Sequence, residues 1–237
     1  MDNEPLFLYS NGMPGTLYIV ATPIGNLQDI SPRAITTLRG VDLVLAEDTR
    51  VAKKLLSHFE IHTPVERFDA NADASAVRRI IDKLKNGATL ALVSDAGTPA
   101  VSDPGSWLVS EVVRALGNEV KIIPIAGPSA LTAALSVSGF YSDIFTFFGF
   151  PPHKKGRTTR LNEIAATKHT VVLFESPHRI EKTLMELRAI CPERHAVICR
   201  ELTKMFETID RGTLAKLAEA GRVRPQGEFV IVLGPLN

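Results

Sequence analysis

The chain has 237 residues, which is enough for one large domain or two compact ones. Hydrophobic residues make up 45% and charged residues 22%, a globular composition that excludes a wholly disordered chain. The formal net charge is only +1, which excludes the uniformly basic field of a nonspecific nucleic-acid binder. Any contact with RNA or DNA must therefore be local.

Three further features indicate the cellular setting. Met1–Gly15 contains Asp2 and Glu4 and has no cationic segment followed by an apolar run, so we expect no signal peptide. No stretch reaches the roughly eighteen apolar residues that a membrane span requires. Cys191 and Cys199 form neither a disulfide framework nor a zinc motif. These features predict a cytoplasmic protein with no membrane contact and no bound metal.

Short apolar runs alternate with helical segments in the first half of the chain. The runs predict strands at 16–21, 42–46, 89–94 and 120–123, and the segments between them include helices at 51–59 and 75–85. Such alternation is typical of an α/β fold with a largely parallel sheet. A capping side chain followed by proline also predicts helix starts, because the side-chain oxygen accepts from free N–H groups. These starts are Ser31-Pro32, Asp103-Pro104 and Ser176-Pro177.

The pattern changes in the segment 145–160, where an aromatic run meets two prolines and then a basic cluster. Paired prolines between apolar blocks indicate a linker between domains. The α/β alternation then resumes, with strands predicted at 170–174, 196–200 and 228–233 and a helix at 176–190. We therefore predict two α/β domains, an N-terminal one over 1–148 and a C-terminal one over 149–237.

Segments rich in glycine, proline and polar residues follow the strands predicted in the first half. They are 22–26, 47–50, 94–105 and 126–130. Ligands of parallel sheets bind beyond the carboxyl ends of the strands, so we expect these segments to outline one pocket. The segment 94–105 is the densest and is predicted to be a ligand loop, in which Asp95 accepts from a hydroxyl or an ammonium group. The chain has neither GxGxxG nor a P-loop, which disfavours a dinucleotide-binding domain and an NTPase.

Charged residues at the predicted strand ends are candidates for catalysis. Glu47 and Asp48 could provide a general base beside Arg50, although acidic residues in the first turn of a helix are an equally good interpretation. Lys204 could hold a phosphate or simply pair with neighbouring glutamates. A basic cluster could contact RNA phosphates, with a solvated linker as the alternative. Its members are Lys154, Lys155, Arg157 and Arg160.

Six motifs in register resemble the branch of the tetrapyrrole methylase superfamily that methylates small-subunit ribosomal RNA. The resemblance extends from Gly15 to Gly234. The motifs are Thr22-Pro23-Ile24-Gly25-Asn26-Leu27, Ala46-Glu47-Asp48-Thr49-Arg50, Val93-Ser94-Asp95-Ala96-Gly97-Thr98-Pro99, Asp103-Pro104-Gly105, Phe174-Glu175-Ser176-Pro177-His178-Arg179 and Arg200-Glu201-Leu202-Thr203-Lys204.

The resemblance implies two α/β domains with S-adenosyl-L-methionine bound in a cleft between them, and a homodimer. It also implies methylation of the ribose 2′-oxygen of a cytidine in the decoding region of 16S rRNA. The residues that it places at the cofactor are Pro23, Ser94, Asp95, Ala96, Gly97, Thr98, Val101, Ser129, Ala130 and Phe174. This superfamily does not bind its cofactor in the Rossmann manner, which agrees with the missing GxGxxG loop.

Methyl transfer to a ribose hydroxyl places two demands on such a site. In-line displacement at a sulfonium needs alignment and exclusion of water. The hydroxyl is a poor nucleophile, so its proton must be removed or its oxyanion stabilised. The candidates for these roles are Glu47, Asp48, Arg50 and Lys204. No metal is required for this chemistry.

Three alternatives remain open at this stage. A corrinoid or porphyrin precursor methylase would share the fold, but a tetrapyrrole substrate does not need a basic loop. A noncatalytic RNA-binding module would explain that loop and leave the strand-end pocket without a purpose, and cofactor titration separates it. A phosphohydrolase using Asp95 and Asp103 would depend on magnesium.

Overall fold

A computed structural model describes residues 15–236 of the chain. It divides into two compact units, Met1–Ser129 and Ala130–Asn237, and each unit is described by itself. The segment for which we expect no signal peptide lies outside the described residues, apart from Gly15. None of the helices within 15–236 combines the length and the apolar character that a membrane crossing needs.

The described part of the first unit is built on a five-stranded sheet in the order β3-β2-β4-β1-β5. The strands are β1 (Thr16–Val20), β2 (Leu43–Ala46), β3 (Val65–Arg67), β4 (Thr89–Val93) and β5 (Lys121–Ile125). Each neighbouring pair in this sheet is parallel. The predicted parallel sheet is therefore confirmed for this unit, and all its strands end at the same edge.

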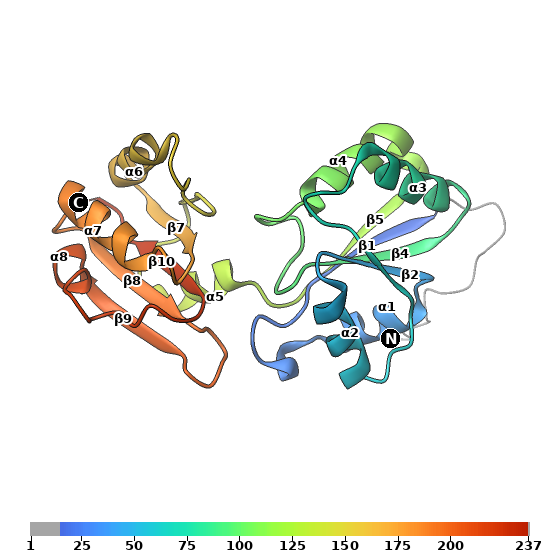
Figure 1. Cartoon of the computed structure of the whole chain (residues 1–237), viewed down its shortest axis with the longest axis horizontal. Coiled ribbons are helices and arrows are strands. Elements are labelled where there is room, and N and C mark those ends of the chain that lie inside the picture. The colour runs from blue at the N-terminus through green and yellow to red at the C-terminus, as the bar shows by residue number, and fades with distance from the viewer. Residues whose placement is uncertain (1–14, 237) are drawn as a thin grey trace. The chain divides into compact units, whose positions relative to one another are not determined.

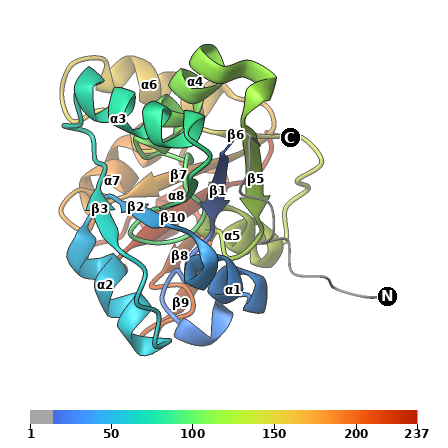
Figure 2. The same cartoon turned by 90° about the vertical axis from the view of Figure 1, so that its right-hand side faces the viewer.

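Helices cover both faces of this sheet (Figures 1 and 2). On one face lie α1 (Pro32–Gly40) and α2 (Thr49–His58), and on the other lie α3 (Ala74–Lys85) and α4 (Gly105–Leu116), with short 3₁₀ turns η1 (Leu27–Asp29) and η2 (Gly117–Glu119). In α3 the buried residues Val77, Ile80, Ile81 and Leu84 recur every three or four positions, so that one stripe faces the core. Burial on both sides explains the continuous apolar runs of the strands.

The second unit has a mixed sheet in the order β6-β7-β10-β8-β9. Its elements are α5 (Ala130–Ser138), β6 (Phe145–Phe147), α6 (Arg157–Ala166), β7 (Thr170–Glu175), α7 (Ile180–Ile190), β8 (His195–Arg200), β9 (Thr208–Thr213), α8 (Leu214–Leu217) and β10 (Phe229–Leu233). Within 130–236 only the pair β6–β7 is parallel. The expectation of a parallel sheet does not extend to this unit, because β8 and β9 form a hairpin and β10 inserts antiparallel between β7 and β8.

The units meet between Ser129 and Ala130, whereas the prolines led us to expect a boundary between 148 and 149. Residues 130–148 belong to the second unit because they contact its sheet. The helix α5 packs against β10, and β6 pairs with β7. The two prolines therefore follow an edge strand of the second sheet.

The helix starts predicted from cap and proline pairs have different outcomes. The helix α1 begins at Pro32, and the Ser31 side chain accepts from the N–H of Ala34 at 3.0 Å, as predicted. The helix α4 begins at Gly105, just after Asp103-Pro104. The third start is displaced, because 177–179 forms a turn before α7 begins at Ile180.

Candidate functional site

Loops at the carboxyl edge of the first sheet are joined to one another by hydrogen bonds. Thr22 after β1 and Gly97 after β4 exchange two backbone hydrogen bonds, with N···O distances of 2.9 and 3.1 Å. The N–H of Asp48 donates to Asp95 Oδ1 at 3.0 Å. The hydroxyl of Thr98 donates to the carbonyl of Pro128 after β5 at 3.0 Å. The prediction that the four strand ends share one rim is confirmed, and we call these linked loops of the first unit the rim.

The central loop of the rim, 94–105, has an unusual backbone. Ala100 and Ser102 both have a φ of 68°, a left-handed conformation that costs energy for residues other than glycine. The Asp103 carboxylate holds this shape, accepting from the N–H of Ala100 at 2.9 Å and from that of Gly105 at 2.8 Å. The observed role of Asp103 is thus to shape the loop, which weakens the phosphohydrolase alternative that needs it at a metal.

Two glycines allow the close approaches in this loop. Gly97 has a φ of +83°, and a Cβ on it would come within 3.2 Å of Ile24 Cγ2. A Cβ on Gly105 would come within 2.8 Å of Asp103 Oδ1 and 2.9 Å of Leu92 Cδ2. The rim therefore depends on glycine at these two positions.

Glu47 follows β2 and is half-buried at a small pocket of the first unit. The pocket is lined by Glu47, Phe68, Leu92, Val93, Ser94, Pro99, Asp103, Pro104 and Gly105. Burial raises the pKa of the Glu47 carboxyl, and the negative charges of Asp95, Asp103 and Asp69 raise it further. A carboxylate with a raised pKa holds a proton more tightly, which suits a general base.

The neighbouring Asp48 is in a different environment, because its carboxylate caps α2. Its Oδ1 accepts from the N–H of Arg50 at 2.8 Å, and its Oδ2 pairs with Arg50 Nη2 at 2.6 Å. Hydrogen bonds from the side chain and the backbone of Arg50 lower the pKa of Asp48. The Arg50 side chain is itself 85% exposed. The two adjacent acids are therefore distinct, with Glu47 suited to accept a proton and Asp48 serving as a cap.

Most residues that we expect at the cofactor lie on the rim or next to it. Gly97 is buried, Asp95 and Ala96 are exposed, and the others of the first unit are half-buried: Pro23, Ser94, Thr98, Val101 and Ser129. Ala130 and Phe174 belong to the second unit. The half-buried Phe174 ring packs edge to face on the rings of Phe147 and Phe150, with distances between ring centroids of 4.9 and 5.6 Å.

Lys204 of the second unit lies in the β8–β9 connection and is paired with two carboxylates. Its Nζ is 2.9 Å from Glu201 Oε1 and 3.1 Å from Glu228 Oε2. Burial lowers the pKa of Lys204, but the hydrogen bonds to Glu201 and Glu228 outweigh burial and raise the pKa overall. The side chain is therefore a cation at neutral pH, which does not suit it to accept a proton.

The four residues of the predicted basic cluster have different surroundings in the structure. Lys154 and Lys155 are exposed. Arg160 pairs with Glu163 at 3.0 Å and lies over the ring of Phe148 at 5.5 Å. Arg157, at 5% exposure, is an ion-paired residue in the first turn of α6. The expectation that Arg157 contacts RNA phosphates is corrected, because its guanidinium faces protein groups.

Sequence reasoning missed residues that shape the environment of Glu47. Asp69 follows β3, a strand of only three residues that contains Glu66 and Arg67, so no apolar run marked it. Asp103 was placed in the loop, but its two backbone contacts depend on the left-handed turns at 100 and 102, which the sequence does not show. A third missed group comprises Thr183 and Glu186, which face Arg157 from α7.

Comparison with known proteins decides the family. The family model for Tetrapyrrole (Corrin/Porphyrin) Methylases matches residues 16–218. The chain belongs to this family. The two-unit α/β architecture also matches a solved structure of uroporphyrin-III C-methyl transferase from Thermus thermophilus complexed with S-adenyl homocysteine. That match has a TM-score of 0.64 at 20% identity and covers 93% of this chain and 97% of the other.

Two other relatives in this family are much more similar to the chain in sequence than the uroporphyrin-III C-methyl transferase is. Ribosomal RNA small subunit methyltransferase I of Halalkalibacterium halodurans is 47% identical over 221 residues, covering 92% of this chain and 75% of the relative. The protein of the same name from Thermotoga maritima is 44% identical over 220 residues, covering 92% of this chain and 98% of the relative.

Proposed function

We propose that this chain is an S-adenosyl-L-methionine-dependent methyltransferase of small-subunit ribosomal RNA, acting on the 2′-oxygen of a cytidine in the decoding region of 16S rRNA. Relatives named as small-subunit rRNA methyltransferases match over 92% of the chain at 44% and 47% identity, which supports the enzyme class and the RNA substrate. The observation that carries the site assignment is the hydrogen-bonded rim with the raised pKa of Glu47 beside it.

The chemistry of the rim fits S-adenosyl-L-methionine. The ligand carries an ammonium group and a sulfonium, and the exposed carboxylate of Asp95 offers a negative partner. Gly97 allows the left-handed turn, with a φ of +83°, that places Asp95 and Ala96 at the surface of the loop. The proposed contacts are Pro23, Ser94, Asp95, Ala96, Gly97, Thr98, Val101, Ser129, Ala130 and Phe174. When bound, the cofactor supplies an activated methyl group.

Within this proposal Glu47 is the general base. A ribose hydroxyl must lose its proton as its oxygen attacks, and a carboxylate with a raised pKa accepts that proton more readily near neutral pH. The cap formed by Asp48 and Arg50 fixes the start of α2 directly after Glu47 and so orients this carboxylate. Lys204 keeps its place among the proposed catalytic residues as a cation that Glu201 and Glu228 hold in position.

The RNA contact of the proposal consists of Lys154, Lys155 and Arg160. A chain with a net charge of +1 needs a concentrated patch to bind phosphates, and the two lysines are exposed. Replacing Lys154 and Lys155 together by alanine should reduce the salt slope of RNA binding by about 0.7 to 0.9 per lost contact. Fluorescence titrations at several salt concentrations measure this slope, and an unchanged slope would make the segment a linker only.

The decisive experiment for the function is methyl transfer with defined substrates. The purified chain is incubated with labelled S-adenosyl-L-methionine and either 16S rRNA or small subunits from cells that lack this modification. The proposal predicts 2′-O-methylcytidine at one position of the decoding region, identified by nuclease digestion and mass spectrometry. Label on uroporphyrinogen and none on rRNA would instead support the tetrapyrrole alternative. We also propose that the chain forms the homodimer that the resemblance implies, and light scattering of the same preparation tests it.

A further inference from the structure

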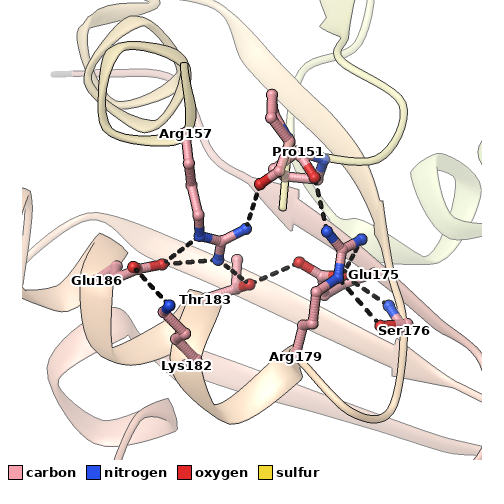
Figure 3. A network of polar contacts seen from close by, with 9 residues as sticks. Pro151, Arg157, Glu175, Ser176, Arg179, Lys182, Thr183 and Glu186 are labelled. Carbon is pink, nitrogen blue, oxygen red and sulfur yellow. Dashed lines mark hydrogen bonds and ion pairs between the residues drawn. The ribbon is translucent and has the colours of Figure 1, made fainter. Parts of the chain in front are cut away.

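A closed ring of polar contacts lies in the second unit, at the end of β7 (Figure 3). Glu175 Oε1 accepts from Arg179 Nη2 at 2.7 Å, and Glu175 Oε2 accepts from the hydroxyl of Thr183 at 2.6 Å. The same hydroxyl oxygen accepts from Arg157 Nη2 at 2.7 Å. The two guanidinium groups then reach one short segment, where Arg179 Nη1 donates to the carbonyl of Pro151 at 2.8 Å and Arg157 Nη1 to that of Pro152 at 3.0 Å.

We call Arg157, Glu175, Arg179 and Thr183 the clamp. Glu175 is 2% exposed, Thr183 is 0% exposed and Arg157 is 5% exposed. Arg179 pairs with Glu175, and Arg157 pairs with Glu186 at 2.6 Å, while the exposed Lys182 lies 3.9 Å from Glu186. Thr183 connects the two ion pairs, since its one hydroxyl donates to one side and accepts from the other.

The clamped prolines lie between two lysines that the proposed function uses and an aromatic ring that packs on another residue of that function. Lys154 and Lys155 follow Pro152 after one intervening residue, His153, and the segment ends where α6 begins at Arg157. On the other side Phe150 packs on Phe174, the residue before Glu175. The clamp therefore fixes both ends of the segment 151–157, because Arg157 is at once its last residue and the donor to Pro152.

We propose that the clamp is a positioning device for the substrate, which holds the 151–157 segment so that Lys154 and Lys155 meet RNA phosphates. This inference rests on the proposed function and adds to it residues that do not touch RNA themselves. Buried ion pairs add little net stability, because desolvation offsets their attraction, and in some proteins they serve to specify geometry instead. Two guanidinium groups directed at the successive carbonyls of Pro151 and Pro152, just before the exposed residues 153–156, are what such a geometric role requires.

Thr183 provides the sharpest test because it is neutral, fully buried and unable to contact RNA. Thr183→Val keeps its volume and removes the hydroxyl that joins the ion pairs, while Thr183→Ser keeps the hydroxyl. We expect Thr183→Val to weaken RNA binding at least about twofold, the lower end for coupled residues. The salt slope should stay unchanged, because both lysines still reach the phosphates once the RNA has ordered the segment. Affinity for S-adenosyl-L-methionine should stay within twofold, and Thr183→Ser should behave as wild type. Hydrogen exchange of amides 153–156 should be faster in the valine variant.

Repeating the Thr183→Val measurement in a chain without the two lysines distinguishes a positioning role from a general loss of RNA binding. In a chain that carries Lys154→Ala and Lys155→Ala, the valine substitution should have no further effect on RNA affinity. An equal loss in both backgrounds, or no loss in the original one, would overturn the inference. If the valine variant does not fold, Glu186→Gln replaces it under the same criteria, since it weakens the hold on Arg157 at a partly exposed position.

The same measurements distinguish this inference from the function on which it rests. If the double alanine variant binds RNA as wild type does, the RNA contact of the proposed function fails, and the inference fails with it. If the double alanine variant loses affinity while Thr183→Val binds normally, only the clamp inference fails.

Discussion

Replacing Glu47 by glutamine should remove most of the methyl-transfer activity without affecting cofactor binding. The amide has nearly the same shape but cannot accept the proton of the ribose hydroxyl. Loss of a general base lowers turnover by about 10²–10⁴-fold, which corresponds to about 2.7–5.5 kcal/mol of barrier. The negative charges that raise the pKa of Glu47 belong to Asp95, Asp103 and Asp69.

Asp48→Asn is the matched control for this experiment. Asp48 precedes Arg50 in the same loop, but its carboxylate caps α2 and its pKa is lowered, so it is a weak base. We expect its amide variant to keep turnover within about tenfold of wild type. Single-turnover rates at saturating cofactor and RNA provide the comparison, with calorimetry for cofactor affinity.

The pH dependence adds a second criterion. Because the pKa of Glu47 is raised, the acid limb of the single-turnover rate should lie above the ordinary range of a glutamate and should vanish in Glu47→Gln. A Glu47→Gln rate within threefold of wild type would leave less than about 1 kcal/mol of barrier for this side chain and would refute its role as base. A loss in Asp48→Asn as large as that in Glu47→Gln would refute the assignment between the two acids.

Three other predictions concern the rim. Asp95→Ala should weaken cofactor binding by about 1.5–3 kcal/mol, the loss of one charge-assisted hydrogen bond, and an unchanged calorimetric affinity would remove Asp95 from the site. Glu47→Gln should be more stable than wild type in urea at neutral pH, because the raised pKa means that folding opposes ionisation of Glu47. The difference should shrink as the pH falls through the raised pKa and vanish only below the ordinary pKa of a glutamate, and a variant less stable at pH 7 would contradict the stated cause. Gly105→Ala should lower the free energy of unfolding by about 1–3 kcal/mol, measured by thermal unfolding, because the added Cβ would come within 2.8 Å of Asp103 Oδ1. Gly212→Ala is the control and should change stability little, because its Cβ would meet no atom closer than 3.6 Å. Equal losses of stability in the two variants would count against crowding at Gly105.

The fold could be predicted well where local chemistry decides it. The apolar runs at 16–21 and 89–94 are strands in the structure at 16–20 and 89–93, because strands buried on both faces need continuous apolar sequence. The strand β9, Thr208–Thr213, lacks such a run, because it lies at a sheet edge and is only half-buried. Sheet direction in the second unit depends on the hairpin and on the insertion of β10, neither of which has a local signal.

The candidate site was only partly visible in the sequence for a similar reason. Strand ends with glycine and acids indicated the rim, because a parallel sheet places such ends together. The raised pKa of Glu47 arises from neighbours distant along the chain, and the burial of Arg157 arises from Glu186 and Thr183 in α7. A basic residue in a basic cluster looks the same in sequence whether it faces solvent or protein.

The linked loops of the rim also bear on when the site can form during synthesis. The contact between Thr22 and Gly97 joins residues 75 positions apart, that between Asp48 and Asp95 joins residues 47 apart, and Thr98 finds its partner 30 residues further on. Contacts of such long range form late in folding, because long loops must close before the contacts can stabilise them. A nascent chain therefore cannot complete the rim until Pro128 has left the ribosome. The first unit must be made almost whole before it can bind its ligand.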